Sequence, residues 1–497
     1  MRRPAFHAGS ATPHLHERGA ALPLIAGVLA VLLALSAFAV DLGWLYLNRA
    51  RLQRAADAAA LAGVIHLPSD IPSVEEDTAD AAAANGFPVG GDTTLSWKAL
   101  DDNKLEVTLN STAPGFLSRV MGFETFSLSA RATAEYVKPV PMGSPSSCFG
   151  VGSNMSSSVL NSAGLGHCNS FTQNFWAAIN GPLTAKEHGD PFAVQCYEVS
   201  SGSCSGGANS DYRAEGYYYA VEIPSGKTSF TVKLYDAGFY DRPNFQTETG
   251  DGDGLAASAN GGMTTHYQLY APDSTPLDPT DNSPVSGCSL TLAAEESSSM
   301  YKNRWANLCT VNPPSGGGLY VLRVWSRANQ GGNNSYSIGV TTNPATGATA
   351  RVYGINDMSV FTNGTTGTAT VYLAEIDPIH AGKKLELRFY DPGENNNNAW
   401  VEVKRPDGST PNCSWFSEDD SGTQTNSGSG QCRIQSTSGG NARFNGQWLT
   451  AIIDIPSTYT CSLDCFWKMA LDMDGSQDRT TWTARVIGNP VRLVPNE

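Results

Sequence analysis

The sequence is poor in charge for its 497 residues, since Asp, Glu, Lys and Arg make up only 16% of it. Lys and Arg number 32 against 47 Asp and Glu, which leaves a net charge of −15, and no basic cluster occurs outside the N-terminal region. Binding to nucleic acid needs clustered Lys and Arg, so this composition argues against a nucleic-acid partner. The surplus of acidic residues indicates a soluble extracellular surface.

Catalytic motifs are missing as well. The eight histidines include no His-Glu-x-x-His pair, and no Gly-x-Ser-x-Gly elbow occurs. Asp420-Ser421-Gly422 imitates the motif of aspartic proteases, but that chemistry needs two carboxylates sharing a proton, and there is no second copy. We therefore predict a protein that is not an enzyme, and a secreted hydrolase is the alternative.

Cysteine is absent before residue 148, and all ten cysteines follow. An even number, all on one side of an apolar segment, is typical of disulfides in an oxidising compartment. A zinc site is the alternative, but no Cys-x-x-Cys pair occurs, and Cys461-x-x-x-Cys465 has no matching second pair. We expect disulfides, and we expect the part of the chain that carries them to lie outside the cytoplasm.

One long apolar run is present, from Ala20 to Val40, without a charge. It is about as long as a helix must be to cross a bilayer. Arg2, Arg3 and Arg18 precede it, which predicts a cytoplasmic tail at 1–19, a transmembrane helix at 20–41 and an extracytoplasmic remainder. A signal peptide cleaved after Ala39 is the competing interpretation, but the apolar, helical pattern continues past that site.

An alanine-rich helical pattern follows the apolar run up to Gly63. Apolar and small residues recur there every three or four positions, which predicts one apolar helix face. Small side chains allow the close approach of another helix, and packing against the domain that follows is the other interpretation. The predicted contact residues of this face are Leu45, Leu52, Ala55, Ala59 and Ala62.

The stretch Arg18-Gly19-Ala20, the apolar run, and Leu52-Gln53-Arg54-Ala55-Ala56-Asp57-Ala58-Ala59-Ala60-Leu61-Ala62-Gly63 resemble the N-terminal region of TadG-like proteins. These are membrane-anchored components of the bacterial tight-adherence (Tad, or Flp) pilus assembly system. The resemblance covers about residues 17–137. Some pilin-like relatives carry Glu at the fifth position after a cleaved Gly; here that position is Leu24, which argues against such processing.

Residues 42–137 are expected to combine the helix with a small α+β domain. Ser73-Val74-Glu75-Glu76 predicts the start of a second helix, which ends near Asn85. Strands are expected at about 94–100, 104–111 and 126–136, because apolar residues alternate there. Residues 138–145, rich in Pro, predict an extended linker.

The remainder contains a weak internal repeat. Residues 230–238 match 385–393, residues 267–273 match 401–407, and residues 319–324 match 466–471. Short alternating strands separated by turns predict two β-sandwiches, at 146–347 and 348–497. The repeat places Cys288–Cys309 and Cys413–Cys432 in equivalent positions, with Cys461–Cys465 as a local bridge. Three pairings remain open for the other four cysteines, and proximity suggests Cys148–Cys168 and Cys196–Cys204.

Acidic turns after the repeated strands are candidate calcium sites, since calcium takes carboxylate and carbonyl oxygens from flexible loops. No complete EF-hand pattern occurs, so solvated turns are the favoured interpretation and calcium binding is the alternative. No other cofactor is expected. The candidate ligands are Asp236, Asp241, Asp251 and Asp253 in the first copy, and Asp391 and Glu394 in the second.

The sequence as a whole predicts a single-pass bacterial membrane protein of mixed fold: a transmembrane helix, a small α+β domain and two β-sandwiches. The expected function is that of a non-enzymatic component of a Tad-type pilus system, as assembly factor, minor subunit or adhesin. The expected partners are the membrane, pilus subunits or other Tad proteins, and a surface glycan. The glycan would bind tryptophans for which core packing is the other interpretation: Trp305, Trp325, Trp400, Trp415, Trp448 and Trp467. A carbohydrate- or calcium-binding module released after a signal peptide is the alternative.

Overall fold

The computed structural model describes residues 21–495 except for 68–70, 102–103, 117, 137–139, 153–154, 171–174, 183–209, 237, 241–251, 255–263, 274–281, 294–299, 328–332, 364–367, 394–398, 439–440, 463–464, 473–476 and 488–490. The chain divides into two compact units. One consists of the residues up to Tyr136 together with those from Val491 onward, and is called the anchor unit below. The other, Val137–Pro490, is called the head.

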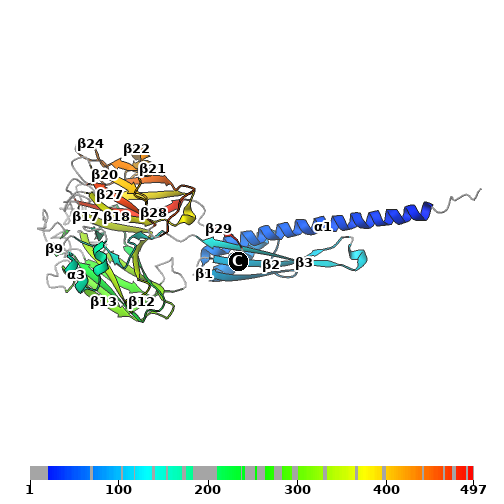
Figure 1. Cartoon of the computed structure of the whole chain (residues 1–497), viewed down its shortest axis with the longest axis horizontal. Helices are drawn as coiled ribbons and strands as arrows, with labels where there is room; N and C mark the ends of the chain where they lie inside the picture. Colours follow the sequence, from blue (N-terminus) through cyan, green and yellow to red (C-terminus); the bar gives the residue numbers. More distant parts are fainter. Residues whose placement is uncertain are drawn as a thin grey trace, which may run out of the picture. The chain divides into compact units, whose positions relative to one another are not determined.

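The anchor unit packs two helices on a four-stranded antiparallel sheet (Figure 1). Its strand order is β1-β2-β3-β29, so the last strand of the chain completes the sheet of the first domain. The elements are α1 (Ala21–Gly63), η1 (Val64–His66), α2 (Ile71–Ala84), β1 (Thr93–Asp101), β2 (Lys104–Pro114), η2 (Ser118–Met121), β3 (Thr125–Tyr136) and β29 (Val491–Val494).

The core of the anchor unit follows from two periodicities. Every second residue of β2 is buried, including Leu105, Val107 and Leu109, as expected for a strand with one covered face. The buried face of α1 carries Leu52 and a series of alanines, so the helix approaches the sheet closely. A Cβ added at Gly63 would lie 2.4 Å from Thr78 Cγ2, so the helix–helix contact requires glycine there.

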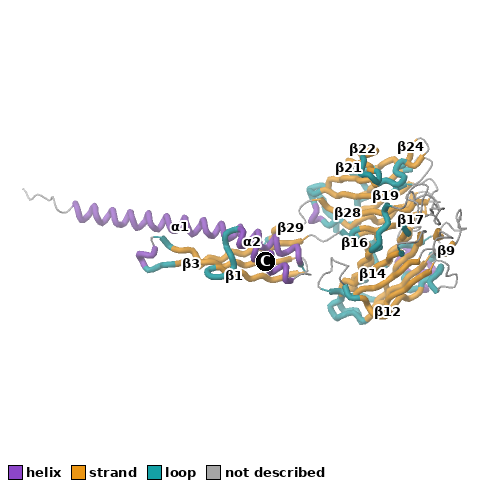
Figure 2. Tube along the Cα trace, turned by 180° about the vertical axis from the view of Figure 1, so that it is seen from behind, coloured by secondary structure: helices purple, strands orange, loops and turns teal. Residues whose placement is uncertain are grey.

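Two large sheets, mostly antiparallel, form the head (Figure 2). The first has the order β12 (Pro284–Ala293), β11 (Thr264–Tyr270), β14 (Gly318–Ser326), β7 (Tyr217–Ile223), β16 (Arg351–Ile355), β4 (Met142–Gly143), β18 (Thr368–Glu375), β27 (Phe466–Asp472), β20 (Trp400–Lys404), β23 (Arg433–Gln435). The second has the order β13 (Ala306–Val311), β8 (Ser229–Asp236), β15 (Asn333–Asn343), β6 (Phe175–Asn180), β17 (Asp357–Asn363), β28 (Gln477–Ile487), β19 (Lys384–Tyr390), β26 (Trp448–Asp454), β21 (Asn412–Glu418), β22 (Gln424–Gln431), with β5 (Cys148–Phe149) beside β15.

The smaller elements of the head lie between these strands. They are α3 (Ser157–Ser162), η3 (Gly166–Ser170), η4 (Pro378–His380), the parallel pair β9 (Gly238–Tyr240) and β10 (Gly252–Gly254), and the antiparallel pair β24 (Thr437–Ser438) and β25 (Asn441–Ala442).

The internal repeat is visible in the strand order of both sheets. In the first sheet β11-β14-β7 is mirrored by β18-β27-β20, and in the second sheet β8-β15 is mirrored by β28-β19. The matched strands of the sequence therefore occupy equivalent places, which confirms the duplication. The two halves are joined within the sheets, because β4 bridges β16 and β18, and β17 pairs with both β6 and β28.

One continuous hydrophobic core contains residues of both large sheets. The hydroxyl groups of Tyr219 on β7 and Tyr336 on β15 share a hydrogen bond at 2.8 Å. The ring of Phe230 on β8 packs against that of Tyr320 on β14. The predicted boundary between residues 347 and 348 lies inside this core-sharing unit, and the predicted linker 138–145 contains the sheet strand β4. The described residues of both predicted sandwiches belong to one compact unit with one core. The division into two sandwiches at residue 347 stays a prediction.

Candidate functional site

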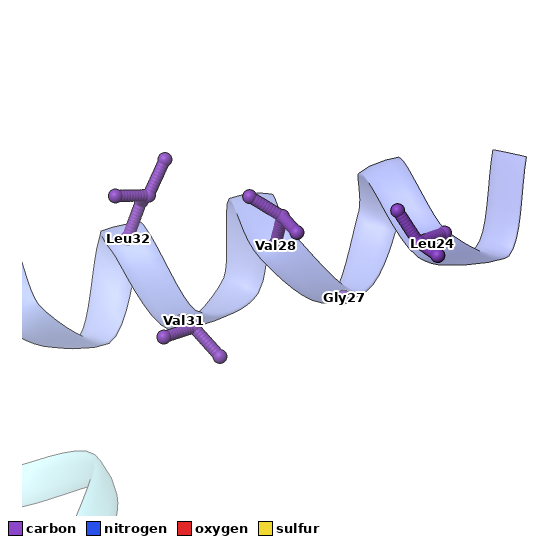
Figure 3. A pocket seen from close by; sticks show the side chains of 5 residues that line it. All are labelled: Leu24, Gly27, Val28, Val31 and Leu32. Atoms are coloured by element: carbon purple, nitrogen blue, oxygen red, sulfur yellow. The ribbon is translucent and has the colours of Figure 1, made fainter. Parts of the chain in front are cut away.

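The apolar half of α1 has no covering element among the described residues. Leu24, Val28, Val31 and Leu32 are each more than half exposed, and Figure 3 shows their side chains pointing in several directions around the helix. Gly27 lies among them, and a Cβ added there would meet no atom of another element within 4 Å. A helix that is apolar on all sides is typical of a membrane span. By length and composition α1 is the one helix of the described chain that is suited to cross a membrane.

Asp41 ends the apolar run and is buried in the anchor unit. Its Oδ1 accepts a hydrogen bond from the backbone N–H of Phe116 at 3.0 Å, and its Oδ2 accepts one from the N–H of Ser118 at 2.7 Å. The rings of Trp44 and Phe116 meet edge to face beside it, with centroids 5.1 Å apart. The loop between β2 and β3 is thus attached to α1 where the apolar segment ends. Sequence reasoning missed this role, although Asp41 is the first charge after the span.

The predicted contact face of α1 packs inside the chain. Leu52, Ala55 and Ala59 are fully buried in a cluster that includes residues of α2, β2 and β3, whereas Leu45 and Ala62 are partly buried. Gln53 Nε2 also donates a hydrogen bond to the carbonyl of Arg131 at 2.8 Å. This face therefore packs against the α+β domain that follows it in the chain, and the described residues include no separate partner helix on it.

The C-terminal strand is held to the anchor unit by pairing and by charge. Tyr136 of β3 lies opposite Val491 of β29, so the chain leaves for the head and returns from it at neighbouring positions. Arg492 places Nη2 2.6 Å from Glu135 Oε2. No motif marks this strand in the sequence, and only its alternating apolar residues could have suggested it.

Four disulfides are present among the described residues. They are Cys148–Cys168, Cys288–Cys309, Cys413–Cys432 and Cys461–Cys465, and Cys196 and Cys204 lie outside the description. Cys288 lies on β12 and Cys309 on β13, so this bridge ties the first large sheet to the second at their edges.

One group of candidate metal ligands occurs in the described chain, made of Cys148, His167 and Cys168. The two sulfurs form a disulfide and so lack the thiolate that binds a metal. His167 Nε2 lies 2.7 Å from Ser147 Oγ, and partial burial lowers the pKa of this imidazole. These contacts describe a histidine packed beside a disulfide.

Asp236, the first predicted calcium ligand, is buried at the end of β8. Its Oδ2 accepts hydrogen bonds from the Tyr267 hydroxyl at 3.3 Å and from Asn334 Nδ2 at 3.2 Å. Burial raises the pKa of Asp236 to about 7, and these two donors oppose that rise. Asp253 lies on β10, where only the backbone is described, and Asp241 and Asp251 lie outside the described residues.

The second copy holds a related arrangement. Asp391, fully buried, accepts a hydrogen bond at Oδ1 from the N–H of Gly446 at 2.7 Å, and Glu394 lies outside the described residues. Tyr235 pairs with Ser337 and Tyr390 with Thr481, which makes Asn334 of β15 equivalent to Asp478 of β28. Asp478 Oδ2 accepts from the N–H of Gly393 at 2.9 Å. Each copy therefore buries an aspartate at the end of the equivalent strand, and calcium there stays a prediction.

A further buried acidic group joins the two halves of the head, and the sequence analysis did not find it. Arg213 places Nη1 2.7 Å from Asp357 Oδ2. Burial raises the pKa of Asp211 to about 7, an effect that Thr481 and Arg213 oppose, and it raises the pKa of Asp357 to about 6. These residues are scattered over the sequence without a motif or a period, so no sequence signal could have grouped them.

Arginine side chains lie over four of the tryptophans that we considered for glycan binding. Guanidinium groups lie 4.5–4.8 Å from the ring centroids, in contacts typical of cation–π pairs. Trp467 is fully buried, which leaves its ring no free face. The pairs are Arg323 with Trp325, Arg388 with Trp448, Arg433 with Trp400, and Arg443 with Trp415.

Residues 19–66 match the model of the Tad family, described as "Putative Flp pilus-assembly TadE/G-like". The family resemblance is thereby confirmed for this segment, which includes α1 and η1. No protein with a curated description matches the chain.

Among solved structures, the similar ones have low identity. The coconut allergen cocosin is 9% identical over 55% of this chain and 76% of its own, with a TM-score of 0.12. Melon necrotic spot virus is 7% identical over 81% and 92%, with a TM-score of 0.14. The CBM22-1–CBM22-2 tandem domain of Paenibacillus barcinonensis Xyn10C is 9% identical over 80% and 92%, with a TM-score of 0.13. TM-scores this low do not indicate a shared fold.

Proposed function

We propose that this chain is a non-enzymatic, membrane-anchored component of a bacterial Tad/Flp-type pilus assembly system, with the head outside the cytoplasm. The observation that carries the proposal is the coincidence of two features in α1. The segment that matches the TadE/G-like model begins with the stretch of α1 that is apolar and exposed on all sides. The same helix then continues, without a break, into the core of the anchor unit.

Charge and disulfides support the orientation. Arg2, Arg3 and Arg18 precede the span, and positive charge on the short side favours a cytoplasmic N-terminus. The four disulfides described all lie after residue 147, and an oxidising compartment is where such bridges persist. The head would then act by contact, as an assembly factor, a minor subunit or an adhesin, with pilus subunits or other Tad proteins as partners.

Fractionation of cells that express the full chain tests the anchoring. We expect the intact chain to stay in the membrane pellet after alkaline carbonate washing, and external protease to digest the head in spheroplasts. A mature protein that begins at Val40 and appears in the soluble periplasmic fraction would support the secreted alternative instead.

The assignment to a pilus system needs a separate experiment in the native host. Chemical cross-linking of intact cells, followed by mass spectrometry of the purified chain, should recover pilus subunits or secretion components of that system. A chain that is membrane-anchored but cross-links to none of them, with unchanged piliation after deletion of its gene, contradicts the assignment and leaves the anchoring in place.

A further inference from the structure

We propose that the tip of the β2–β3 hairpin enters the lipid interface of the membrane that α1 crosses, with Phe116 and Phe123 as its lipid-contacting side chains. This inference rests on the proposed anchoring of α1. It concerns the anchor unit alone, whose hairpin tip lies beside α1 in both Figure 1 and Figure 2.

The tip is a compact structure attached to the helix. The N–H of Gly115 donates to the carbonyl of Glu124 at 3.0 Å, and the N–H of Phe123 donates to the carbonyl of Ser118 at 3.1 Å, which closes the loop. Asp41 accepts from two of its backbone N–H groups, as described above. The height of the tip along α1 is therefore set by Asp41, the first charged residue after the apolar run.

That height agrees with the thickness of a bilayer. The segment 21–40 precedes Asp41, and at about 1.5 Å of rise per residue it spans about 30 Å, the thickness of a hydrocarbon core. If this segment lies in the hydrocarbon, Asp41 and the attached tip lie at the boundary with the headgroups. A carboxylate that accepts two N–H hydrogen bonds is also better suited to this boundary than an uncompensated charge.

The side chains at the tip match this environment. Phe116 is 53% exposed and Phe123 58%, and the neighbouring Tyr46 of α1 is 78% exposed. Trp and Tyr are enriched at membrane interfaces, and Phe is typical of the apolar face of segments that lie in the interface. Arg119, also exposed, supplies a cation that can reach lipid phosphates.

Lipid is favoured over a protein partner as the occupant because the apolar surface is continuous. The exposed apolar residues of the span extend through Val40 and Leu42 to the level of Phe116. A surface joined in this way to a membrane-spanning face meets the bilayer without any further partner. Burying the two rings removes apolar surface from water, which favours the inserted position of the tip.

Photocross-linking of the full chain in membranes tests the proposal. A benzoylphenylalanine residue is placed at Phe116, at Phe123 or at Ile65, which is 48% exposed and lies 24 positions beyond Asp41 in η1, about 36 Å along the helix axis. After irradiation, mass spectrometry counts lipid adducts. We expect several-fold more lipid adduct at positions 116 and 123 than at 65. Equal yields at all three positions, or adducts with protein in place of lipid, would overturn the proposal.

The same samples separate this proposal from the anchoring on which it rests. If the chain leaves the membrane on carbonate washing, the anchoring itself has failed; if it stays and the tip gives no lipid adduct, only the tip proposal has failed. Asp41→Ala removes the acceptor that positions the tip. In that variant we expect the lipid adduct at position 116 to fall several-fold while carbonate-resistant anchoring is kept. If Asp41 only stabilised the fold, its loss would not lower the lipid adduct at the tip while leaving the anchoring intact.

Discussion

The anchor unit and the head build their cores from opposite kinds of side chain. The anchor unit buries alanines at successive turns of α1 and along β3, and it contains no cysteine. The head buries large rings such as Trp176, Trp467 and Trp482, and disulfides tie its strands together. Close approach of backbones demands a small residue at each contact, whereas a ring-filled core accepts many sequences of similar volume. The two units should therefore respond differently to removed and to added side-chain volume.

The largest expected loss of stability follows from opening a cavity in the core of the head. Trp482 is fully buried on β28 and stacks on Phe175 with centroids 6.4 Å apart. Trp482→Ala should lower the free energy of unfolding of the head by about 3–5 kcal/mol. Hydrogen exchange in increasing urea, read by mass spectrometry, should show the loss in head peptides only. Tyr46→Ala, at an exposed ring, is the control, and an equal loss in peptides of the anchor unit would break the distinction.

Removal of a disulfide sharpens the same contrast. Cys413→Ala combined with Cys432→Ala opens a bridge between residues 19 apart in sequence. The unfolded head gains chain entropy, so its stability should fall by about 3 kcal/mol. Thermal unfolding of the full chain in detergent measures the loss. A reducing agent should destabilise the parent head and leave the cysteine-free anchor unit unchanged, and a parallel loss in both units would contradict this.

Added volume should affect the anchor unit instead. On α2, Ala82 is fully buried in the core, while the next residue, Ala83, is exposed. Ala82→Leu forces the helix away from its neighbours and should cost about 1–3 kcal/mol. The matched Ala83→Leu should change stability by less than about 0.5 kcal/mol. Exchange rates of α1 and α2 amides measure both variants, and equal effects would mean that close packing does not limit this unit.

How far the sequence predicts each unit follows from the same physics. In the anchor unit the unbroken apolar run, the spacing of Leu52, Ala55 and Ala59, and the alternation in β2 and β3 each predict one element. The structure places these elements close to the expected bounds, with α2 beginning at Ile71, earlier than the expected cap at Ser73. The closing strand β29 was not predicted, because pairing between residues far apart leaves no local signal.

In the head the repeat predicted which strands are equivalent, but not that both halves share their sheets. That arrangement depends on short segments such as Met142–Gly143, whose place between β16 and β18 no periodicity can reveal in two residues. The same holds for Asp211, Arg213 and Asp357, which approach one another only after the two halves have joined. Local patterns predict elements, and the long-range pairing of elements is settled by the fold.

The pH dependence of stability should also differ between the head and the anchor unit, because the head buries the carboxyl group of Asp236. The pKa of Asp236 is about 7 in the folded head, raised by burial, against roughly 3.9 when unfolded. The folded state therefore holds this proton more tightly, so its contribution to stability is present near pH 4 and is lost as the pH rises through 7. We expect the parent head to lose about 1–2 kcal/mol between pH 6 and pH 8 from this group. Asp236→Asn should flatten that dependence in urea titrations, whereas Asp454→Asn, at an exposed carboxylate, should leave it unchanged.

The smallest effect concerns the strand by which the chain returns to the anchor unit. Arg492 is partly exposed, and its ion pair with Glu135 joins β29 to β3. A pair of this exposure contributes about 0.2–1 kcal/mol, so Arg492→Gln should leave the melting of both units almost unchanged. It should nevertheless raise the exchange rates of the β29 amides, because only four residues hold this edge strand in the sheet. Lys384→Gln, which removes an exposed ion pair on β19 of the head, is the matched control and should leave the β29 amides unaffected. Unchanged exchange in Arg492→Gln would mean that pairing with β3 alone keeps the returning strand in place.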